Sequence, residues 1–505
     1  MTAEVHTLAI LDVHDTFDSL SPITGDVVGT WPVHSADDVE SAVQRAREAA
    51  SWWSAMTFDE RAEQLITWAG VITRRIAQLA ELVHQETGKP HSDATLEAAM
   101  AVDHLAWAAR NARKVLGRHK VSTGLLMANQ AATVEYLPLG VVGVIGPWNY
   151  PVFTPMGSIV YALSAGNAVV FKPSELTPGV GQWLAATFAE VVPDHPVLQV
   201  VTGRGETGAA LCRAGVDKLA FTGSTDTGKL VMAACAETLT PVVIEAGGKD
   251  AVLVDEDADV DAAADATLWG ACSNAGQTCV GVERVYVHER VYDDFVERLL
   301  DKARDLRAED VPLAKMGPMT MPGQREVIAS HIQDALDRGG KAVLGGPDAV
   351  GERFVQPTVL IDVPEDSRAV QEETFGPTVT VTRVKDMDEA LAKANGTRYG
   401  LGSTVFSRTR GMELAQRIRS GMTAVNGMIS FAGIPSLPFG GVGDSGFGRI
   451  HGPDGLKEFT YAKAIARQRF KPPLALTSFT RTAATDDRLT QIITLLYGRG
   501  STLQK

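Results

Sequence analysis

From about residue 140 onward, the chain alternates short apolar runs with longer stretches of helical length. Several of the short runs border Gly, Pro or Asn. Continuous apolar strands that alternate with helices predict parallel sheets covered on both faces. We expect a first series of strands at 141–145, 168–171, 197–201, 218–221, 241–244 and 251–254, and a second at 284–288, 341–344, 357–361, 378–382, 402–406 and 422–426.

The chain before residue 120 shows helical periodicity instead. Ser35 and Asp38 have the spacing of a capping box at a helix start. A longer apolar pattern from Leu65 to Val83 predicts a helix that ends at Gly88, because Gly commonly terminates helices. The N-terminal segment is therefore expected to be helical.

Two further segments differ from both patterns. Residues 121–138 alternate weakly and suggest an extended hairpin. The tail after Pro472 carries apolar residues on one helical face, which we interpret as a docked helix rather than a membrane anchor. These residues are Leu489, Ile492, Ile493 and Leu496.

Length and composition limit the possible classes of protein. A chain of 505 residues exceeds what one hydrophobic core usually serves, so two or more domains are expected. The net charge of −14 argues against a nucleic-acid partner. No apolar stretch is long enough to span a bilayer, and the N-terminus does not resemble a signal peptide. We expect a soluble, cytoplasmic protein with no membrane partner.

The four cysteines provide the first candidate chemistry. They form no CxxC pair, and the eleven histidines contain no HExxH, so we expect no metal site. Cys279 ends the segment Gly276-Gln277-Thr278-Cys279, 34 positions after Glu245 in Glu245-Ala246-Gly247-Gly248-Lys249. A thiolate can form a thioester and a carboxylate can activate the water that hydrolyses it. Cys212, Cys235 and Cys272 are interpreted as small buried residues.

Three glycine-containing turns are candidate phosphate sites. The stretch 203–208 matches GxGxxG, but this short pattern is weak evidence in a chain with 48 glycines. The stretch 223–230 nearly matches a P-loop, except that Leu230 replaces the hydroxyl residue that would hold magnesium. What remains is a strand that turns through Gly223 and Ser224 into a helix N-terminus, which suits a pyrophosphate.

A second cofactor signal is Phe171-Lys172-Pro173-Ser174-Glu175 at the end of the second strand. The carboxyl end of a parallel strand is where open α/β sheets bind ligands. Glu175 can accept both hydroxyls of an adenosine ribose, and Lys172 can donate to the same sugar. A 2′-phosphate would be repelled by Glu175, so NAD⁺ is expected rather than NADP⁺, although NADP⁺ stays open.

Taken together, these segments resemble the aldehyde dehydrogenase superfamily over about residues 20–465. In this chain, Ile145-Gly146-Pro147-Trp148-Asn149-Tyr150-Pro151 resembles the oxyanion-hole segment of the family. Likewise, Phe221-Thr222-Gly223-Ser224 resembles the family's pyrophosphate turn. The ribose, general-base and nucleophile segments resemble those around Glu175, Glu245 and Cys279. Two later matches, Glu373-Thr374-Phe375-Gly376-Pro377 and Pro438-Phe439-Gly440-Gly441, follow in the family's order.

The resemblance implies an α/β fold with three parts and a tail. A Rossmann-like dinucleotide-binding domain of parallel strands would take 1–120 and 139–247, and a second α/β catalytic domain would take 248–445. A small β oligomerisation element would combine 121–138 with 460–472, leaving 473–505 as the tail. A homodimer or homotetramer is expected.

The resemblance also implies roles for individual residues. Cys279 would attack the aldehyde, Asn149 would stabilise the oxyanion, and Glu245 would activate water for hydrolysis. Trp148, Glu373 and Phe375 would contact the cofactor, with Glu373 on the nicotinamide ribose. A Glu at position 245 favours release of a free acid over the alternative, an acyl-CoA.

Departures from the family pattern bear on the pocket. Ala246 stands where Leu is usual, and Thr374 stands where an aliphatic residue is common; both are interpreted as changes of packing. The expected substrate entrance includes residues 427–437 and offers no Lys or Arg to bind a second carboxylate. We therefore expect a hydrophobic aliphatic or aromatic aldehyde, with succinate semialdehyde as the alternative. Further entrance residues are Tyr150, Phe153, Thr278, Val280 and Phe431.

Overall fold

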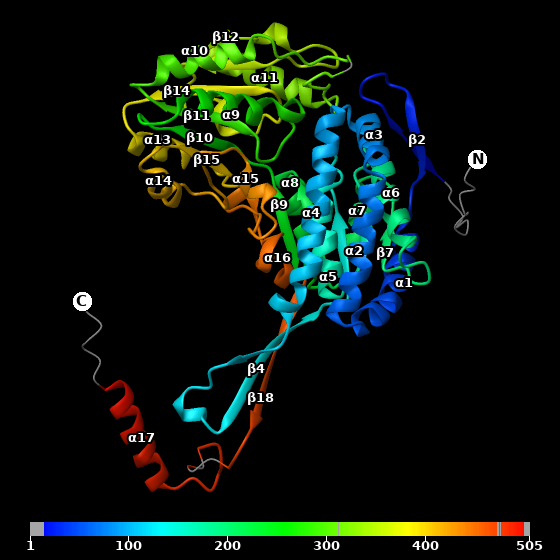
Figure 1. Cartoon of the computed structure of the whole chain (residues 1–505), viewed down its shortest axis with the longest axis vertical. Helices are drawn as coiled ribbons and strands as arrows, with labels where there is room; N and C mark the ends of the chain where they lie inside the picture. The colour runs from blue at the N-terminus through cyan, green and yellow to red at the C-terminus, as the bar shows by residue number, and fades with distance from the viewer. Residues whose placement is uncertain (1–14, 312, 472–473, 475, 499–505) are drawn as a thin grey trace. The chain divides into compact units, whose positions relative to one another are not determined.

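The computed structural model describes residues 15–311, 313–471, 474 and 476–498. The chain divides into two compact units (Figure 1). The larger unit takes the chain up to Leu116 and again over Leu137–Tyr461, and the smaller unit takes Gly117–Tyr136 and the chain from Ala462 onward.

The first sheet of the larger unit has the strand order β17-β9-β8-β5-β6-β7. From β9 to β7 all neighbours are parallel, whereas β17 pairs antiparallel with β9. The chain enters at β5, continues outward through β6 and β7, and then crosses back to β8. This reversal leaves a crevice beyond the carboxyl ends of β5 and β8, where open α/β sheets bind ligands. The strands are β5 Val141–Ile145, β6 Ala168–Lys172, β7 Leu198–Val200, β8 Lys218–Gly223, β9 Val242–Ala246 and β17 Gly446–Phe447.

Helices cover this first sheet because its central strands are apolar on both faces. Every residue of β6 is buried, for example. The helices that precede or interleave with these strands are α1 Ala36–Ala55, α2 Phe58–Arg74, α3 Ile76–Thr87, α4 His91–Leu116, α5 Phe153–Ala165, α6 Pro178–Ala189, α7 Gly205–Arg213, α8 Thr225–Ala236 and α16 Gly452–Glu458. The hairpin of β1 (Thr16–Leu20) and β2 (Val27–Pro32) precedes them.

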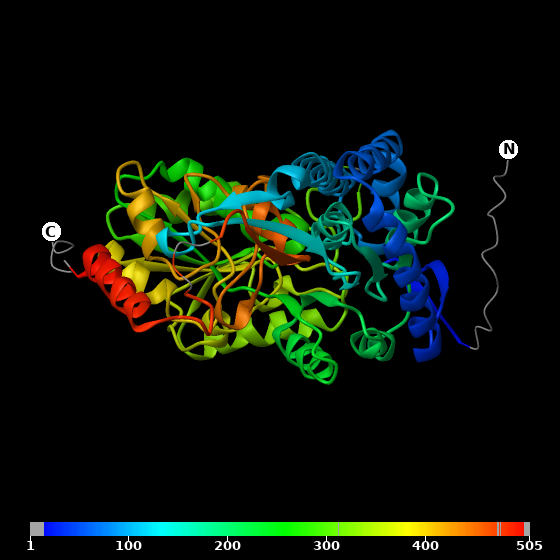
Figure 2. The same cartoon turned by 90° about the horizontal axis from the view of Figure 1, so that it is seen from below.

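The second sheet has the order β12-β13-β14-β11-β10-β15-β16, parallel except for the antiparallel edge strand β12. It lies at the opposite end of the larger unit from the N-terminal helices (Figure 2). Its strands are β10 Asp250–Val254, β11 Val282–His288, β12 Lys341–Leu344, β13 Thr358–Ile361, β14 Thr378–Val384, β15 Ser403–Phe406 and β16 Ala424–Val425. Its helices are α9 Val260–Cys272, α10 Tyr292–Ala303, α11 Gln324–Asp337, α12 Arg368–Gln371, α13 Met387–Ala394, α14 Gly411–Arg417 and α15 Ser430–Gly433.

The apolar runs located the strands well. Every expected strand is present, with ends within two residues of the expected ones. One assignment was wrong, because the run at 251–254 belongs to the second sheet, where β10 pairs with β11 and β15. The chain leaves the first sheet at Gly247 and Gly248, directly after β9.

The helix starts and ends follow local capping chemistry. Ser35 accepts the amide of Asp38 at 3.2 Å, and the Asp38 carboxylate accepts the amide of Ser35 at 2.9 Å, which confirms the capping box. Gly88 ends α3 in the left-handed conformation, with φ at 72°. The single helix expected before Gly88 is instead two helices, because the backbone leaves helical geometry at Arg75, with φ at −116° and ψ at 19°.

The smaller unit contains a three-stranded sheet in the order β18-β4-β3 and one long helix. Its elements are β3 His119–Val121, β4 Gln130–Pro138, β18 Thr460–Gln468 and α17 Ala483–Tyr497. No described side chain of α17 is buried within this unit, and the docked tail helix stays a prediction. The oligomerisation role expected for this unit stays a prediction.

A buried ion pair links α4 to the backbone at the start of α5. Lys89 and Glu97 pair with fully buried side chains. The Glu97 carboxylate also accepts the amides of Val152 and Phe153, at 2.8 and 3.1 Å. The Lys89 ammonium lies 3.8 Å from the centroid of the Tyr150 ring.

We expect Lys89→Met to lower the free energy of unfolding by about 3–5 kcal/mol, because Glu97 would keep a buried charge without its partner. Lys341→Met is the matched control, since Lys341 forms an exposed pair with Asp362 and its loss should cost less than about 1 kcal/mol. Thermal and urea unfolding of the two variants measure the difference. Equal losses of stability would contradict a special role for the buried pair.

Candidate active site

A cavity of about 310 Å³ opens where β5, β8 and β9 end. It is lined by all the candidate site residues except Lys172 and Glu175. Those lining residues are Trp148, Asn149, Gly223, Ser224, Glu245, Cys279, Glu373 and Phe375. These candidate residues come from five separate segments of the sequence.

The turn after β5 positions Asn149 against the segment that precedes Cys279. Its side-chain amide donates to the carbonyl of Gln277 at 2.9 Å. In return, the Asn274 amide donates to the carbonyl of Asn149 at 3.0 Å. Because a side-chain amide has two N–H groups, the second N–H of Asn149 has no partner among the described residues.

Cys279 follows a strained turn. Asn274, Ala275 and Gly276 all have positive φ, at 51°, 54° and 72°. Left-handed non-glycine residues cost about 1–3 kcal/mol each, so surrounding contacts must hold them. The Gln277 side chain provides such contacts, because it donates to the Asn274 carbonyl at 3.0 Å and accepts the amide of Thr320 at 2.8 Å.

Glu245 lies beside Cys279 at the end of β9 and is 4% exposed. Its Oε2 accepts the Thr222 hydroxyl at 3.2 Å, and its Oε1 has no hydrogen-bond partner in the described chain. Burial raises the pKa of Glu245 to about 7, although contacts with Cys279 and Thr222 oppose this. The carboxyl can therefore exchange a proton near neutral pH.

The Cys279 thiol is held mostly protonated in this environment. Burial raises its pKa well above the ordinary value, and the neighbouring Glu245 carboxylate raises it further. Among the four cysteines, Cys279 is partly exposed, whereas Cys212, Cys235 and Cys272 are buried. A base next to the thiol is therefore needed to generate thiolate, and Glu245 is in place for that.

Glu373 and Phe375 form the opposite wall. Glu373 accepts the amide of Gly248 at 3.0 Å, and a Cβ at Gly247 would overlap its carboxyl group. Burial raises the pKa of Glu373 to about 8, and the charge of Glu283 adds to this. The Phe375 ring packs edge-on against Trp148, with centroids 5.6 Å apart. The backbone is not extended at Phe375, which has φ at 51°, and the side chains of Glu373 and Phe375 both line the cavity.

Gly223 and Ser224 form the turn into α8. The Ser224 hydroxyl accepts the amide of Thr227 at 3.3 Å and so caps the helix. Leu230, which breaks the P-loop pattern, is 72% exposed. The GxGxxG stretch begins at Gly203 beyond β7 and does not line the cavity.

Lys172 and Glu175 lie outside the 310 Å³ cavity, at the carboxyl end of β6 beside β5. The Lys172 ammonium donates to the Pro173 carbonyl at 2.9 Å and is 3.8 Å from the Glu175 carboxylate. The Glu175 side chain is 47% exposed, so it can meet a ligand that extends along the strand ends.

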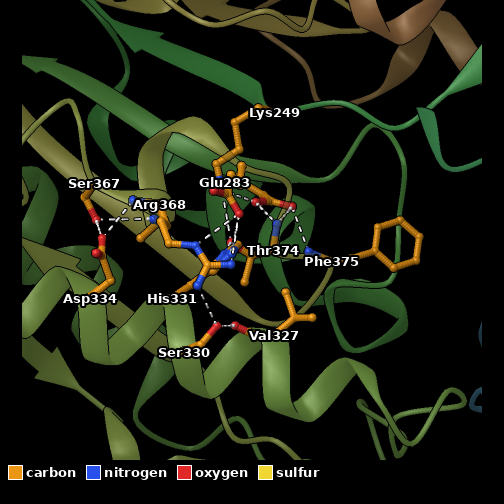
Figure 3. A network of polar contacts seen from close by, with 12 residues as sticks. Lys249, Glu283, Val327, Ser330, His331, Asp334, Ser367, Arg368, Thr374 and Phe375 are labelled. Carbon is orange, nitrogen blue, oxygen red and sulfur yellow. Dashed lines mark hydrogen bonds and ion pairs between the residues drawn. The ribbon is translucent and has the colours of Figure 1, made fainter. Parts of the chain in front are cut away.

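Three residues have positions that the sequence motifs did not indicate. Met321 and Gln324 also line the cavity, although they belong to no motif that could have singled them out. Thr374 proves to be more than a packing change, because its hydroxyl accepts the Lys249 ammonium at 3.0 Å and lies 3.1 Å from His331 Nδ1 (Figure 3). That correction follows from burial, since a buried hydroxyl requires partners.

Neither a metal-ligand cluster nor a membrane-spanning helix is found among the described residues. Within residues 15–498, apart from 312, 472–473 and 475, no cluster of His, Cys, Asp or Glu could hold a metal ion. None of the helices in the same part of the chain is long and apolar enough to cross a membrane.

The sequence matches known proteins over nearly its full length. A model of the aldehyde dehydrogenase family matches residues 11–465. A 4,4'-diapolycopene aldehyde oxidase from Methylomonas sp is 36% identical over 494 residues, covering 97% of this chain and 93% of that protein. A protein named "Putative succinate-semialdehyde dehydrogenase (NADP+) 2" from Mycobacterium ulcerans is 38% identical over 467 residues, covering 90% and 89%.

Solved structures agree with the sequence comparison. The crystal structure of an NAD-dependent aldehyde dehydrogenase from Sinorhizobium meliloti has a TM-score of 0.88 at 35% identity, covering 93% of this chain and 95% of that one. This confirms the expected fold class. The family model and these relatives together show that the chain belongs to the aldehyde dehydrogenase family of NAD(P)-dependent oxidoreductases.

Proposed function

We propose that this chain oxidises a hydrophobic aldehyde to its carboxylic acid with NAD⁺, through a thioester on Cys279. The observation that carries the proposal is the contact between the Cys279 thiol and a Glu245 carboxyl whose pKa is about 7. A carboxyl group with that pKa can take the thiol proton and later activate water at neutral pH.

The residues of the chain account for each step. Glu245 accepts the thiol proton, and the Cys279 thiolate bonds to the aldehyde carbon. The negative charge that develops on oxygen is stabilised by the second N–H of Asn149 and by the Cys279 amide. A nicotinamide bound in this cavity would supply the acceptor for the hydride from this carbon. After Glu245 has released the thiol proton to solvent, it deprotonates water, which displaces Cys279 from the acyl group and gives the acid.

The residues also fit the dinucleotide. The aromatic pair of Trp148 and Phe375 offers an apolar wall for a nicotinamide, and the Glu373 carboxyl reaches the same cavity. The N-terminus of α8 supplies free amides for a pyrophosphate. Lys172 and Glu175 lie at the next strand end along the sheet, where an adenosine ribose would follow.

A hydrophobic substrate is supported by the 427–437 segment, which is expected at the substrate entrance and carries no Lys or Arg. Its large apolar side chains Ile434 and Leu437 are 42% and 41% exposed. The acidic Asp93 lies next to the Asn274 amide, and burial raises its pKa. The apolar side chains and the acidic Asp93 favour a neutral aldehyde over an aldehyde that carries a carboxylate. Relatives are named for both kinds of aldehyde.

We expect the purified chain to form NADH with octanal and benzaldehyde, with kcat/KM about tenfold or more above that for succinate semialdehyde. Cys279→Ala should abolish NADH formation, whereas Cys272→Ala, which removes a buried thiol, should retain it. Absence of turnover across the panel would refute the proposal. A higher kcat/KM for succinate semialdehyde would refute only the hydrophobic substrate.

The pH dependence of kcat/KM should report the ionisation of Glu245. Its protonated form cannot accept the thiol proton, so activity should rise with pH and level off above about 7. Glu245→Gln should remove this limb from the residual activity, measured as NADH formation, because neither the thiol nor the water then has a neighbouring base. An unchanged pH limb in the variant would assign the titration to another group.

Glu175 should set the preference for NAD⁺. Removing its carboxylate in Glu175→Gln should raise kcat/KM for NADP⁺ relative to NAD⁺ by about tenfold, because repulsion of a 2′-phosphate is lost. Glu190→Gln is the control, since Glu190 pairs with Arg75 on the surface. If both variants keep the wild-type ratio, another residue determines the choice of cofactor.

A further inference from the structure

The segment that carries Glu373 and Phe375 is held by a buried carboxylate. Glu283 lies on β11, and its side chain is 5% exposed. Its two oxygens accept successive backbone amides, from Thr374 at 2.8 Å and from Phe375 at 3.0 Å (Figure 3). Through these bonds Glu283 fixes the backbone that carries the Glu373 and Phe375 side chains.

The carboxylate is in turn held by Lys249. The Lys249 side chain is completely buried, pairs with Glu283 and donates to the Thr374 hydroxyl at 3.0 Å. His331 Nδ1 lies 3.1 Å from that hydroxyl, and Gln324 donates to the Thr374 carbonyl at 2.8 Å. Every polar group of Thr374 therefore has a partner.

This arrangement is poorly explained as a source of stability. Removing two charges from water costs several kcal/mol per ion, and apolar pairs of similar volume often replace buried ion pairs without loss. The parallel strands β11 and β14 already pair through their own backbone bonds, from Arg284 and Thr380 onward. An apolar pair, however, could not offer two directed acceptors to the amides of residues 374 and 375.

We propose that Glu283 is a positioning residue for the cofactor, acting through the amides of Thr374 and Phe375 to orient Glu373 and Phe375 toward the nicotinamide ribose. Lys249 and the Thr374 hydroxyl hold the Glu283 carboxylate in the geometry that this requires. The proposal rests on the proposed function, because it takes the 310 Å³ cavity as the site of the nicotinamide half.

Glu283→Gln tests the proposal, because it keeps the shape of the side chain but leaves a single acceptor oxygen and no charge. The dissociation constant for NAD⁺, measured by isothermal titration calorimetry without aldehyde, should rise about tenfold. KM for NAD⁺ should rise in parallel. Thr374→Val removes the contacts of the hydroxyl but keeps the backbone bonds to Glu283, so its affinity loss should be smaller, about threefold.

A second readout separates positioning from general disruption. Glu283 lies four residues after Cys279, so damage to the fold there would also impair the thiol. Hydrolysis of 4-nitrophenyl acetate at Cys279 needs no NAD⁺, and its rate should fall by a smaller factor than the NAD⁺ affinity. Glu256→Gln is the matched control, because Glu256 forms an exposed pair with Arg290, and it should match the wild type in both assays.

The outcomes distinguish the two proposals. Wild-type NAD⁺ affinity in Glu283→Gln, or equal losses of affinity and ester hydrolysis, would overturn the positioning role. If Glu283→Gln fails to fold, an undiminished NAD⁺ affinity in Thr374→Val would overturn it as well. If NAD⁺ affinity falls as expected but the wild type oxidises no aldehyde, the positioning role is supported and the proposed function fails.

Discussion

Removal of water from the carboxyl groups around Cys279 is the constraint on which the other features of this site depend. Burial raises the pKa of Glu245 to about 7 and that of Glu373 to about 8. These carboxyls also raise the pKa of the thiol. The same region holds a carboxyl that can exchange a proton near neutral pH, on Glu245, and a side-chain N–H without a partner among the described residues, on Asn149. The buried Lys249 ammonium pairs with Glu283.

The two sheets make this concentration of groups possible. In the first sheet the chain reverses direction at β5 and β8, so two neighbouring strand ends open onto one crevice. The second sheet begins with β10 directly after the Gly247–Gly248 turn, which brings the ends of the two sheets together. Segments that are more than 200 residues apart, such as those of Asn149 and Glu373, thereby share one cavity of about 310 Å³.

The sequence predicted features that depend on local chemistry and missed those that depend on distant partners. Apolar runs located the strands, because burial on both faces leaves a continuous hydrophobic signal. The same runs could not assign β10 to its sheet, since an apolar strand does not encode its neighbour. The Ser35 capping box could be predicted from its sequence, whereas the break in the helix at Arg75 could not. Thr374 resembled a packing change because Lys249 and His331, its partners, are distant in sequence.

The buried pair of Lys249 and Glu283 has a consequence for how such a chain can diverge. Lys249 follows Glu245 by four residues, and Glu283 follows Cys279 by four. A substitution at either position alone would leave an uncompensated buried charge on the segments that carry Glu245 and Cys279. We therefore expect the residues at positions 249 and 283 to be retained together or replaced together among related sequences. This holds even though neither side chain lies at the reacting atoms.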